Sequence, residues 1–265
     1  MLIKRLASGI VLIGIIIATI YIDWVCALVA TVFIGLGLYE FFTMLEKKGI
    51  GIYKYFGIGM GLLIPLSILF RFELTKKWEL LLVVLALFCL MLMQFRRRKS
   101  SGVIVDISTT IFGILYVSWF FSFIIKIRYL EGGLGLLAAV LLMTKLGDIG
   151  AYFVGSAIGK RPLLPRISPK KTVEGAVAGL LFSALGGVIS RPFLHLSYPH
   201  LIFMGILLGI AGQLGDLSES LMKRDCQIKD SGNILPGMGG ILDEIDSLLF
   251  TAPIFYFYMS ILLAK

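Results

Sequence analysis

The stretch GDLSESLMKRDCQIKDSGNILPGMGGILDEID, residues 215–246, contains five Asp, two Glu, two Lys and one Arg, in a chain that otherwise consists of long apolar runs. Ionisable side chains in or beside a membrane helix are costly to desolvate unless they line a wet, functional cavity. The apolar runs therefore predict the fold, and this polar stretch is where we expect the chemistry.

The composition outside this stretch is that of an integral membrane protein. Of the 265 residues, 58% are hydrophobic and 15% are charged, and the mean hydropathy is +0.95. Soluble domains are only about 45–50% apolar. Runs of about 20 apolar residues can cross the hydrocarbon core. The fold class that we predict is an all-α polytopic membrane helix bundle with about nine spans: 7–22, 25–45, 51–70, 79–95, 103–125, 134–155, 175–190, 199–219 and 241–263.

Lysine and arginine residues concentrate in alternate loops between these spans. If the N-terminus is cytoplasmic, the inner loops contain residues 47–48, 96–99, 160–171 and 223–229, which are rich in cations. Cytoplasmic loops carry an excess of Lys and Arg, so the pattern predicts an N-in/C-out topology. It also explains the formal charge of +9, so we expect no nucleic-acid partner. The predicted site then faces the cytoplasm from the inner membrane, among membrane lipids.

Polar residues are unevenly distributed along the chain, which we interpret as one membrane domain, residues 1–265. Residues 1–130 are mainly spans and turns and predict a helical scaffold. Residues 131–265 contain two long inner loops rich in Gly, Pro, Ser and charged residues, and predict the catalytic half.

The first of these polar clusters is TKLGDIGAYFVGSAIGKRPLLPRISPKKTVEG, residues 144–175. Helical spacing places four residues on one face: Asp148, Tyr152, Gly155 and Gly159. This face combines an acid and a phenol with two glycines, at which another helix backbone can approach closely. The loop that follows carries hydroxyl groups and cations directly before the N-terminus of the next helix, a combination that predicts an anion site. The predicted site includes Ser168, Lys170, Lys171, Thr172 and Glu174. The structural alternative is a charged loop with a capping box, in which Lys171 or Thr172 leads to Glu174.

The second cluster begins with a polar stripe at the end of the eighth predicted span, formed by Asp216, Glu219, Ser220 and Lys223. Such stripes usually face the bundle interior or a water-filled cavity. After a PGMGG loop come Asp243 and Asp246, one helical turn apart, and carboxylates at this spacing can share a metal ion. Asp243 could instead complement the helix macrodipole.

Oxygen ligands without a nearby thiolate or imidazole favour Mg²⁺, with a second cation left open. The two histidines, His195 and His200, fall in a predicted outer loop, where we interpret them as surface or interfacial residues. Their position argues against Ser-His-Asp acyl transfer and HExxH hydrolysis.

In this order the residues resemble the membrane phosphatidate cytidylyltransferase (CDP-diacylglycerol synthase) family. The C-terminal signature of that family is matched by Ser220, Lys223, Arg224, Lys229, Asp230, Pro236, Gly237, Gly239, Gly240, Asp243 and Asp246. An upstream pattern is matched by Asp148, Ala151, Tyr152, Gly155, Gly159, Lys160, Ser168, Pro169, Lys171, Thr172, Glu174 and Gly175. The resemblance covers the C-terminal half, and its long spaced motif is very specific. Two positions depart from it: Met238 stands where the family usually has His, and Glu244 where it usually has Arg.

The resemblance implies that CTP and phosphatidate react to give CDP-diacylglycerol and pyrophosphate. A lipid phosphomonoester is already a nucleophile, so the protein would mainly have to compensate charge and hold the in-line geometry. The residues that we expect to act on the substrates and Mg²⁺ are Asp216 and Asp243 as metal ligands, Asp246 as a further ligand or as a residue that orients them, and Lys223 as a further catalytic residue. Substrate contacts are expected from Lys170, Lys171, Arg224 and Lys229, and from the polar cavity residue Asp148. The matched residues Ser168, Thr172, Glu174, Ser220, Asp230, Gly239 and Gly240 complete the expected substrate site.

Two other functions remain open on the sequence alone. A CTP-dependent lipid kinase of the polyprenol or dolichol kind would share the nucleotide site but would release CDP. A transporter would also place charges between helices, although repeat symmetry and broken midplane helices would be more typical of one. A homodimer is a further partner that the sequence leaves open.

Overall fold

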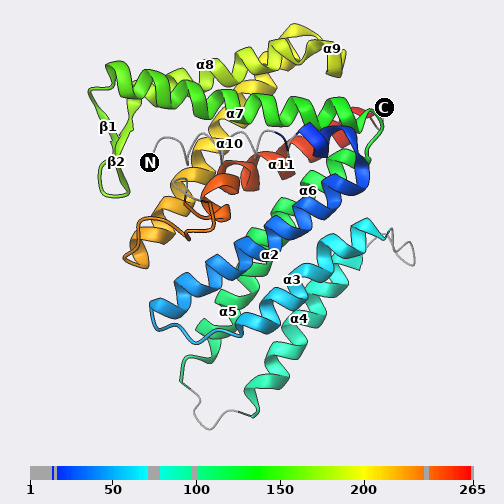
Figure 1. The fold of residues 1–265 in the computed structure, drawn as a ribbon, viewed down its shortest axis with the longest axis vertical. Coiled ribbons are helices and arrows are strands. Elements are labelled where there is room, and N and C mark those ends of the chain that lie inside the picture. Colours follow the sequence, from blue (N-terminus) through cyan, green and yellow to red (C-terminus); the bar gives the residue numbers. More distant parts are fainter. Residues whose placement is uncertain (1–13, 15–16, 71–77, 97–100, 236–238, 264–265) are drawn as a thin grey trace. The chain divides into compact units, whose positions relative to one another are not determined.

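The computed structural model describes residues 14, 17–70, 78–96, 101–235 and 239–263. Within that part of the chain the secondary structure is almost entirely helical (Figure 1). The described residues include five helices that are long and apolar enough to cross a membrane: α2 (Asp23–Lys47), the continuous helix Val103–Tyr129, α7 (Gly133–Ile158), α10 (Tyr198–Asp225) and α11 (Ile241–Leu263). The prediction of an all-α membrane protein is confirmed.

Each predicted span from 25–45 onward coincides with a helix to within a few residues. Three of these helices are apolar but shorter than a typical membrane span: α3 (Lys54–Leu69), α4 (Trp78–Gln94) and α8 (Val173–Ile189). The first predicted span, 7–22, lies mostly outside the described residues. Nine membrane crossings and the N-in/C-out orientation therefore stay predictions.

Two small elements were not predicted. The connection between α7 and α8 forms an antiparallel hairpin of β1 (Pro162–Leu164) and β2 (Ser168–Thr172), with Pro162 paired to Thr172. Its strand signal is weak because the strands are short and both contain proline, which cannot donate to the ladder. The other element is the single-turn helix α9 (Arg191–Leu194), between α8 and α10.

The chain divides into two compact units. The first unit contains Met1–Ile125 and Cys226–Glu244, and the second contains Lys126–Asp225 and Ile245–Lys265. The loop that follows α10, together with the first residues of α11, therefore belongs with the N-terminal helices.

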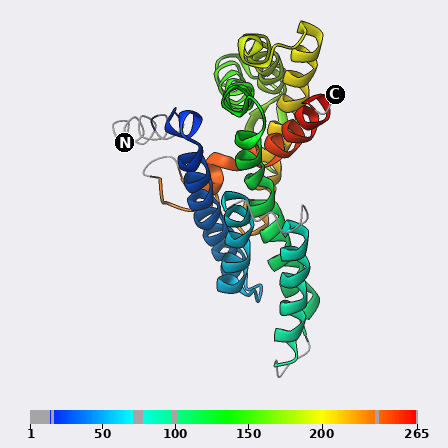
Figure 2. The ribbon, with the colours of Figure 1, turned by 90° about the vertical axis from the view of Figure 1, so that its right-hand side faces the viewer.

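The first unit is built on α2 and α3, which lie side by side in both views (Figures 1 and 2). Phe42 of α2 packs so closely on Gly57 of α3 that a Cβ atom there would lie 2.7 Å from the ring. Lys54, at the start of α3, is buried but not isolated: its ammonium lies 3.0 Å from Glu46 Oε2 and 2.7 Å from Thr43 Oγ1. These contacts explain how a lysine is accommodated between apolar helices.

A hydroxyl in the continuous helix Val103–Tyr129 replaces a hydrogen bond that α3 lacks. Pro65 in α3 has no backbone N–H, so the carbonyl of Gly61, one turn earlier, has no helical donor. The Ser118 hydroxyl donates to this carbonyl at 2.5 Å, and both residues are buried. Ser118 lies in the π-helical segment η1 (Ile114–Trp119), which joins α5 (Val103–Gly113) to α6 (Phe120–Tyr129).

The second unit contains α7, α8 and α10, with α7 and α8 running side by side (Figure 1). Glycines allow the close packing: a Cβ atom on Gly179 of α8 would lie 3.1 Å from the Gly147 carbonyl oxygen of α7. Between α8 and α10, Gln213 Nε2 donates to the Ala176 carbonyl at 2.9 Å. This packing fixes the helices that carry the acidic residues described next.

Candidate active site

The C-terminal turns of α10 carry charged side chains on the stripe that the sequence predicted. Glu219 is fully buried and forms an ion pair with Lys223, one turn further along the helix. Asp216 is partly exposed and lies 2.5 Å from the ammonium of Lys171 in β2. The hairpin therefore brings the predicted anion-binding loop to the predicted metal ligand of α10.

Two further carboxylates come from α11 and α7. Asp246 is 7% exposed, and the charges of Asp216, Glu219, Lys145 and Asp148 all act on its carboxyl group. These four carboxylates and the lysines paired with them form what we call the acidic cluster, which comprises Asp148, Asp216, Glu219, Asp246, Lys145, Lys171 and Lys223.

Asp148 is held in the acidic cluster by two neighbours. The Ser247 hydroxyl donates to Asp148 Oδ2 at 3.0 Å, and Lys145 Nζ lies 3.5 Å from the same oxygen. All residues of the acidic cluster belong to the second unit. Three helices and one strand thus converge on one polar region.

The chemistry of the acidic cluster suits a divalent cation. Carboxylates brought together out of water repel one another, and nearby cations relieve that repulsion. Hard oxygen donors are the ligands that Mg²⁺ prefers. As arranged here, Asp148, Asp216 and Glu219 each pair with a lysine. Among the described residues no group of three or more His, Cys, Asp or Glu side chains is poised to hold a metal ion. The donor types fit Mg²⁺, whose binding stays a prediction.

Asp243 has a structural role in the first unit. Its Oδ2 accepts hydrogen bonds from the Gly240 N–H at 2.7 Å, and from the Ser231 N–H and hydroxyl at 3.0 Å each. The carboxylate thus ties the start of α11 to the loop before it, which supports the helix-terminus alternative for this residue. Its role as a metal ligand stays a prediction.

Glu40 of α2 had no role in the sequence-based prediction, yet it is 3% exposed and contacts the same loop. Its carboxylate accepts hydrogen bonds from the Ile241 N–H at 3.1 Å, the Leu242 N–H at 2.9 Å and the Ser231 hydroxyl at 3.2 Å. One signal could have identified Glu40: it is an acid within an apolar run, where an unpartnered carboxylate is costly.

The glycine-rich loop is partly described. Leu235 and Gly239 exchange two backbone hydrogen bonds, of 2.9 and 3.1 Å, and Gly239 has a φ of +115°, which favours glycine. The intervening residues 236–238, which include the departure at Met238, lie outside the described residues. The second departure, Glu244, is partly buried in the first turn of α11.

The predicted anion-binding loop forms β2 and the start of α8. Thr172 caps α8, since its hydroxyl accepts a hydrogen bond from the Gly175 N–H at 3.2 Å. Glu174 accepts hydrogen bonds from the Lys160 and Arg161 N–H groups at 3.1 and 3.2 Å. Its own backbone N–H and these two donors lower the pKa of Glu174, which precedes the predicted span 175–190. Thr172 is therefore the helix cap, whereas Glu174 bonds to Lys160 and Arg161 and no bond that would complete a capping box is seen among the described residues. Whether this loop also binds an anion stays a prediction.

The other predicted substrate contacts differ in position. Ser220 is buried beside the acidic cluster residues of α10, and Arg224 Nε donates to the Ile167 carbonyl at 3.2 Å. Lys170 is exposed in β2, while Lys229 and Asp230 are exposed in the loop of the first unit. Substrate contacts by these residues, and by Ser168, stay predictions. The prediction assigned no site role to Glu219 or Lys145, which belong to the acidic cluster.

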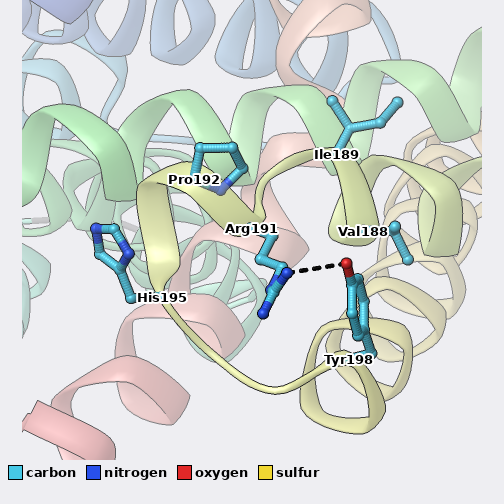
Figure 3. A pocket seen from close by; sticks show the side chains of 6 residues that line it. All are labelled: Val188, Ile189, Arg191, Pro192, His195 and Tyr198. Atoms are coloured by element: carbon cyan, nitrogen blue, oxygen red, sulfur yellow. Dashed lines mark hydrogen bonds between the residues drawn. The ribbon is translucent and has the colours of Figure 1, made fainter.

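A pocket of about 520 Å³ lies elsewhere in the second unit, where α8, α9 and α10 meet (Figure 3). Arg191 Nη1 donates to the Tyr198 hydroxyl at 2.9 Å, and His195 lines the pocket (Figure 3). Tyr198 begins α10 and Asp216 lies 18 residues later, so about 27 Å of helix separates them. The pocket is thus distinct from the acidic cluster. His195 and His200 are exposed, as predicted.

Comparison with known proteins gives a consistent assignment. The family model described as "Cytidylyltransferase family" matches residues 3–262. A phosphatidate cytidylyltransferase of Synechocystis sp. is 35% identical over 269 residues, which cover 91% of this chain and 90% of that protein. A phosphatidate cytidylyltransferase of Bacillus subtilis is 43% identical over 150 residues, 56% of each chain. An uncharacterized protein of Escherichia coli is 38% identical over 151 residues, 57% of this chain and 50% of that protein.

Proposed function

Because the chain belongs to the cytidylyltransferase family, we propose that it is a phosphatidate cytidylyltransferase, which condenses CTP with phosphatidate to give CDP-diacylglycerol and pyrophosphate in phospholipid biosynthesis. The observation that carries this proposal is the acidic cluster, in which four carboxylates and three lysines meet near the C-terminal turns of α10. Such a region suits a reaction between two phosphorylated molecules.

The reaction requires little covalent chemistry from the protein. A phosphate oxygen of phosphatidate forms a bond to the α-phosphorus of CTP, and the bond from that phosphorus to the bridging oxygen of pyrophosphate breaks. The nucleophile is already anionic, so no side chain has to remove a proton from a hydroxyl. The enzyme has to bring two polyanions together in line and stabilise the charge that develops on the leaving group.

The lysines of the acidic cluster are suited to this task. Lys171 reaches Asp216 from β2, so a phosphate bound beside this pair meets a cation carried on an ordered hairpin. Lys223 would contact the phosphates from α10, with Arg224, Lys170 and Lys229 as further cations. Ammonium and guanidinium groups at these positions would hold the substrates against their mutual repulsion.

Mg²⁺ is the metal cofactor that we propose, with Asp216 and Asp243 as ligands, Asp246 as a further ligand or as a residue that orients them, and Asp148 nearby. When bound, Mg²⁺ would neutralise charge on the phosphate oxygens. A second cation is left open, because the acidic cluster contains more carboxylates than one site requires.

The topology that we propose has nine membrane helices, with the N-terminus in the cytoplasm and the C-terminus outside. The placement of cations along the sequence supports it. CTP is a cytoplasmic, water-soluble nucleotide, so the acidic cluster would face the cytoplasm from the inner membrane. The homodimer stays a prediction.

A product assay tests the function. Purified protein in detergent is supplied with labelled CTP, phosphatidate and Mg²⁺, and the products are separated. We expect CDP-diacylglycerol and pyrophosphate in equal amounts. Release of CDP with a phosphorylated polyprenol, when a polyprenol is supplied, would instead identify a lipid kinase. Substrate flux across proteoliposomes without consumption of CTP would identify a transporter.

A further inference from the structure

A single buried carboxylate joins α2 to both ends of the glycine-rich loop. Oε1 of Glu40 accepts a hydrogen bond from the N–H group of Ile241, and Oε2 accepts hydrogen bonds from the N–H group of Leu242 and the hydroxyl of Ser231. The three contacts measure 3.1, 2.9 and 3.2 Å, respectively. Ile241 and Leu242 follow the loop, and Ser231 precedes it. Ser231 is therefore held near Ile241 and Leu242 by a side chain that lies 191 positions before Ser231 in the sequence.

The start of α11 explains why a carboxylate is needed. The first N–H groups of a helix have no partner within the helix, and an adjacent side chain usually supplies one. The residue before Ile241 is Gly240, which has no side chain. Glu40 therefore acts as the cap from another helix, and its negative charge also suits the helix N-terminus.

The fit around this carboxylate leaves no room for a larger neighbour. A Cβ atom on Gly240 would overlap both Ser231 Oγ and the carboxylate of Glu40. A Cβ atom on Gly232 would also overlap this carboxylate. Close contact with Glu40 thus explains why positions 232 and 240 are occupied by glycine. The backbone at both positions packs directly against the Glu40 carboxylate.

The contact network also reaches Asp243. The Ser231 hydroxyl lies 3.2 Å from Glu40 Oε2 and 3.0 Å from Asp243 Oδ2. Since one hydroxyl proton can point to only one carboxylate at a time, the two acids share this donor. Glu40 and Asp243 are thus linked through the Ser231 hydroxyl.

We infer that Glu40 is a positioning residue for the reaction: it holds Ser231 and the start of α11, from Gly240 to Asp243, in the arrangement required to bind the substrates. This inference rests on the proposed function, because it takes Gly240 and Asp243 to belong to the substrate and metal site. Glu40 itself need not touch a substrate. Its removal should change the geometry of the loop, and small displacements of binding groups can lower turnover by about 100-fold.

The experiment compares full-length variants with Glu40 changed to Ala, Gln or Asp. A matched control is Glu46→Gln, which removes an acid from the same helix at a position paired with Lys54 and not with the loop. For each variant, kcat and KM for CTP and for phosphatidate are measured, together with the thermal unfolding midpoint in detergent.

We expect Glu40→Ala to lower kcat/KM for CTP by about 10- to 100-fold, and Glu40→Gln to recover part of the loss because its amide oxygen can still accept one backbone N–H. Glu46→Gln should leave kcat and KM close to those of the parent protein. If Glu40→Ala and Glu40→Gln lower the unfolding midpoint while kcat and KM stay unchanged, the residue is structural and the inference is wrong.

Hydrogen exchange supplies a readout that does not depend on the reaction. In Glu40→Gln, the amides of Ile241 and Leu242 should exchange faster than in the parent protein, whereas amides in α7 should not change. Unchanged exchange at Ile241 and Leu242 would overturn the inference even in an active enzyme. Conversely, failure of the parent protein to make CDP-diacylglycerol would refute the proposed function. Hydrogen exchange at Ile241 and Leu242 would still report whether Glu40 holds the start of α11, so the two failures can be distinguished.

Discussion

Ser118→Ala removes the hydroxyl that donates to the carbonyl left without a helical partner by Pro65. The serine is fully buried and its oxygen lies 2.5 Å from the Gly61 carbonyl oxygen. Removing a hydroxyl creates little empty space, so the main cost is an unsatisfied buried carbonyl, worth about 1–3 kcal/mol. Interhelical hydrogen bonds in membrane proteins average about 0.6 kcal/mol, with a maximum near 1.7 kcal/mol. We therefore expect a loss of about 1–1.5 kcal/mol in the free energy of unfolding.

The same reasoning predicts that the loss depends on Pro65. In Pro65→Ala, residue 65 regains an N–H, which can donate to the Gly61 carbonyl within α3. Ser118→Ala should then cost only a few tenths of a kcal/mol, and the two changes should be coupled by about 1 kcal/mol. Ser122→Ala is a matched control, because Ser122 is also fully buried but donates at 2.7 Å to the carbonyl of Trp119, three residues earlier in the same continuous helix.

The assay is reversible unfolding in mixed micelles, followed by tryptophan fluorescence in the four members of the cycle and the control. Equal losses for Ser118→Ala in the parent protein and in the Pro65→Ala variant would refute the reasoning, because the hydroxyl would then not be replacing the missing N–H.

The remaining predictions concern the acidic cluster. Lys171→Met should lower kcat/KM for CTP by about 10²-fold, because it removes the cation beside Asp216. Lys170→Met, in the same strand but exposed, should lower kcat/KM by less than about 10-fold. The reverse order in steady-state assays would contradict the role inferred for Lys171 from its contact with Asp216. Asp246→Asn should abolish formation of CDP-diacylglycerol while the detergent-solubilised protein elutes as the parent does in size exclusion, and near-normal turnover would remove Asp246 from the metal site. Chelation by EDTA should abolish turnover and Mg²⁺ should restore it; full activity in EDTA would exclude a dissociable divalent cation.

The positions of the helices could be predicted because a membrane span requires a contiguous apolar run, which is a local property of the sequence. The stripe on α10 could be predicted for a similar reason: helical spacing alone places Asp216, Glu219 and Lys223 on one side. These predictions required no knowledge of how helices pack against one another.

The contacts of the site could not be predicted in the same way. The ion pair between Lys171 and Asp216 depends on how the hairpin folds back onto α10, and residues 45 positions apart carry no local signal of it. Glu40 is an acid in an apolar run, which indicates that a partner exists but not that the partner is the start of α11. The spacing of Asp243 predicts a metal ligand, whereas its hydrogen bonds also give it a capping role.

The distance in sequence between Glu40 and its partners has a consequence for biosynthesis. The N–H group of Ile241 is 201 residues from Glu40, and at roughly 5–20 residues per second the ribosome needs about 10–40 s to make that interval. Until the final helix enters the membrane, α2 carries an acid without those backbone donors. In a nascent chain that stops early, the Glu40 carboxylate would remain without its backbone donors from α11. Cellular quality control could recognise this carboxylate within an apolar helix and so distinguish the truncated chain from the finished protein.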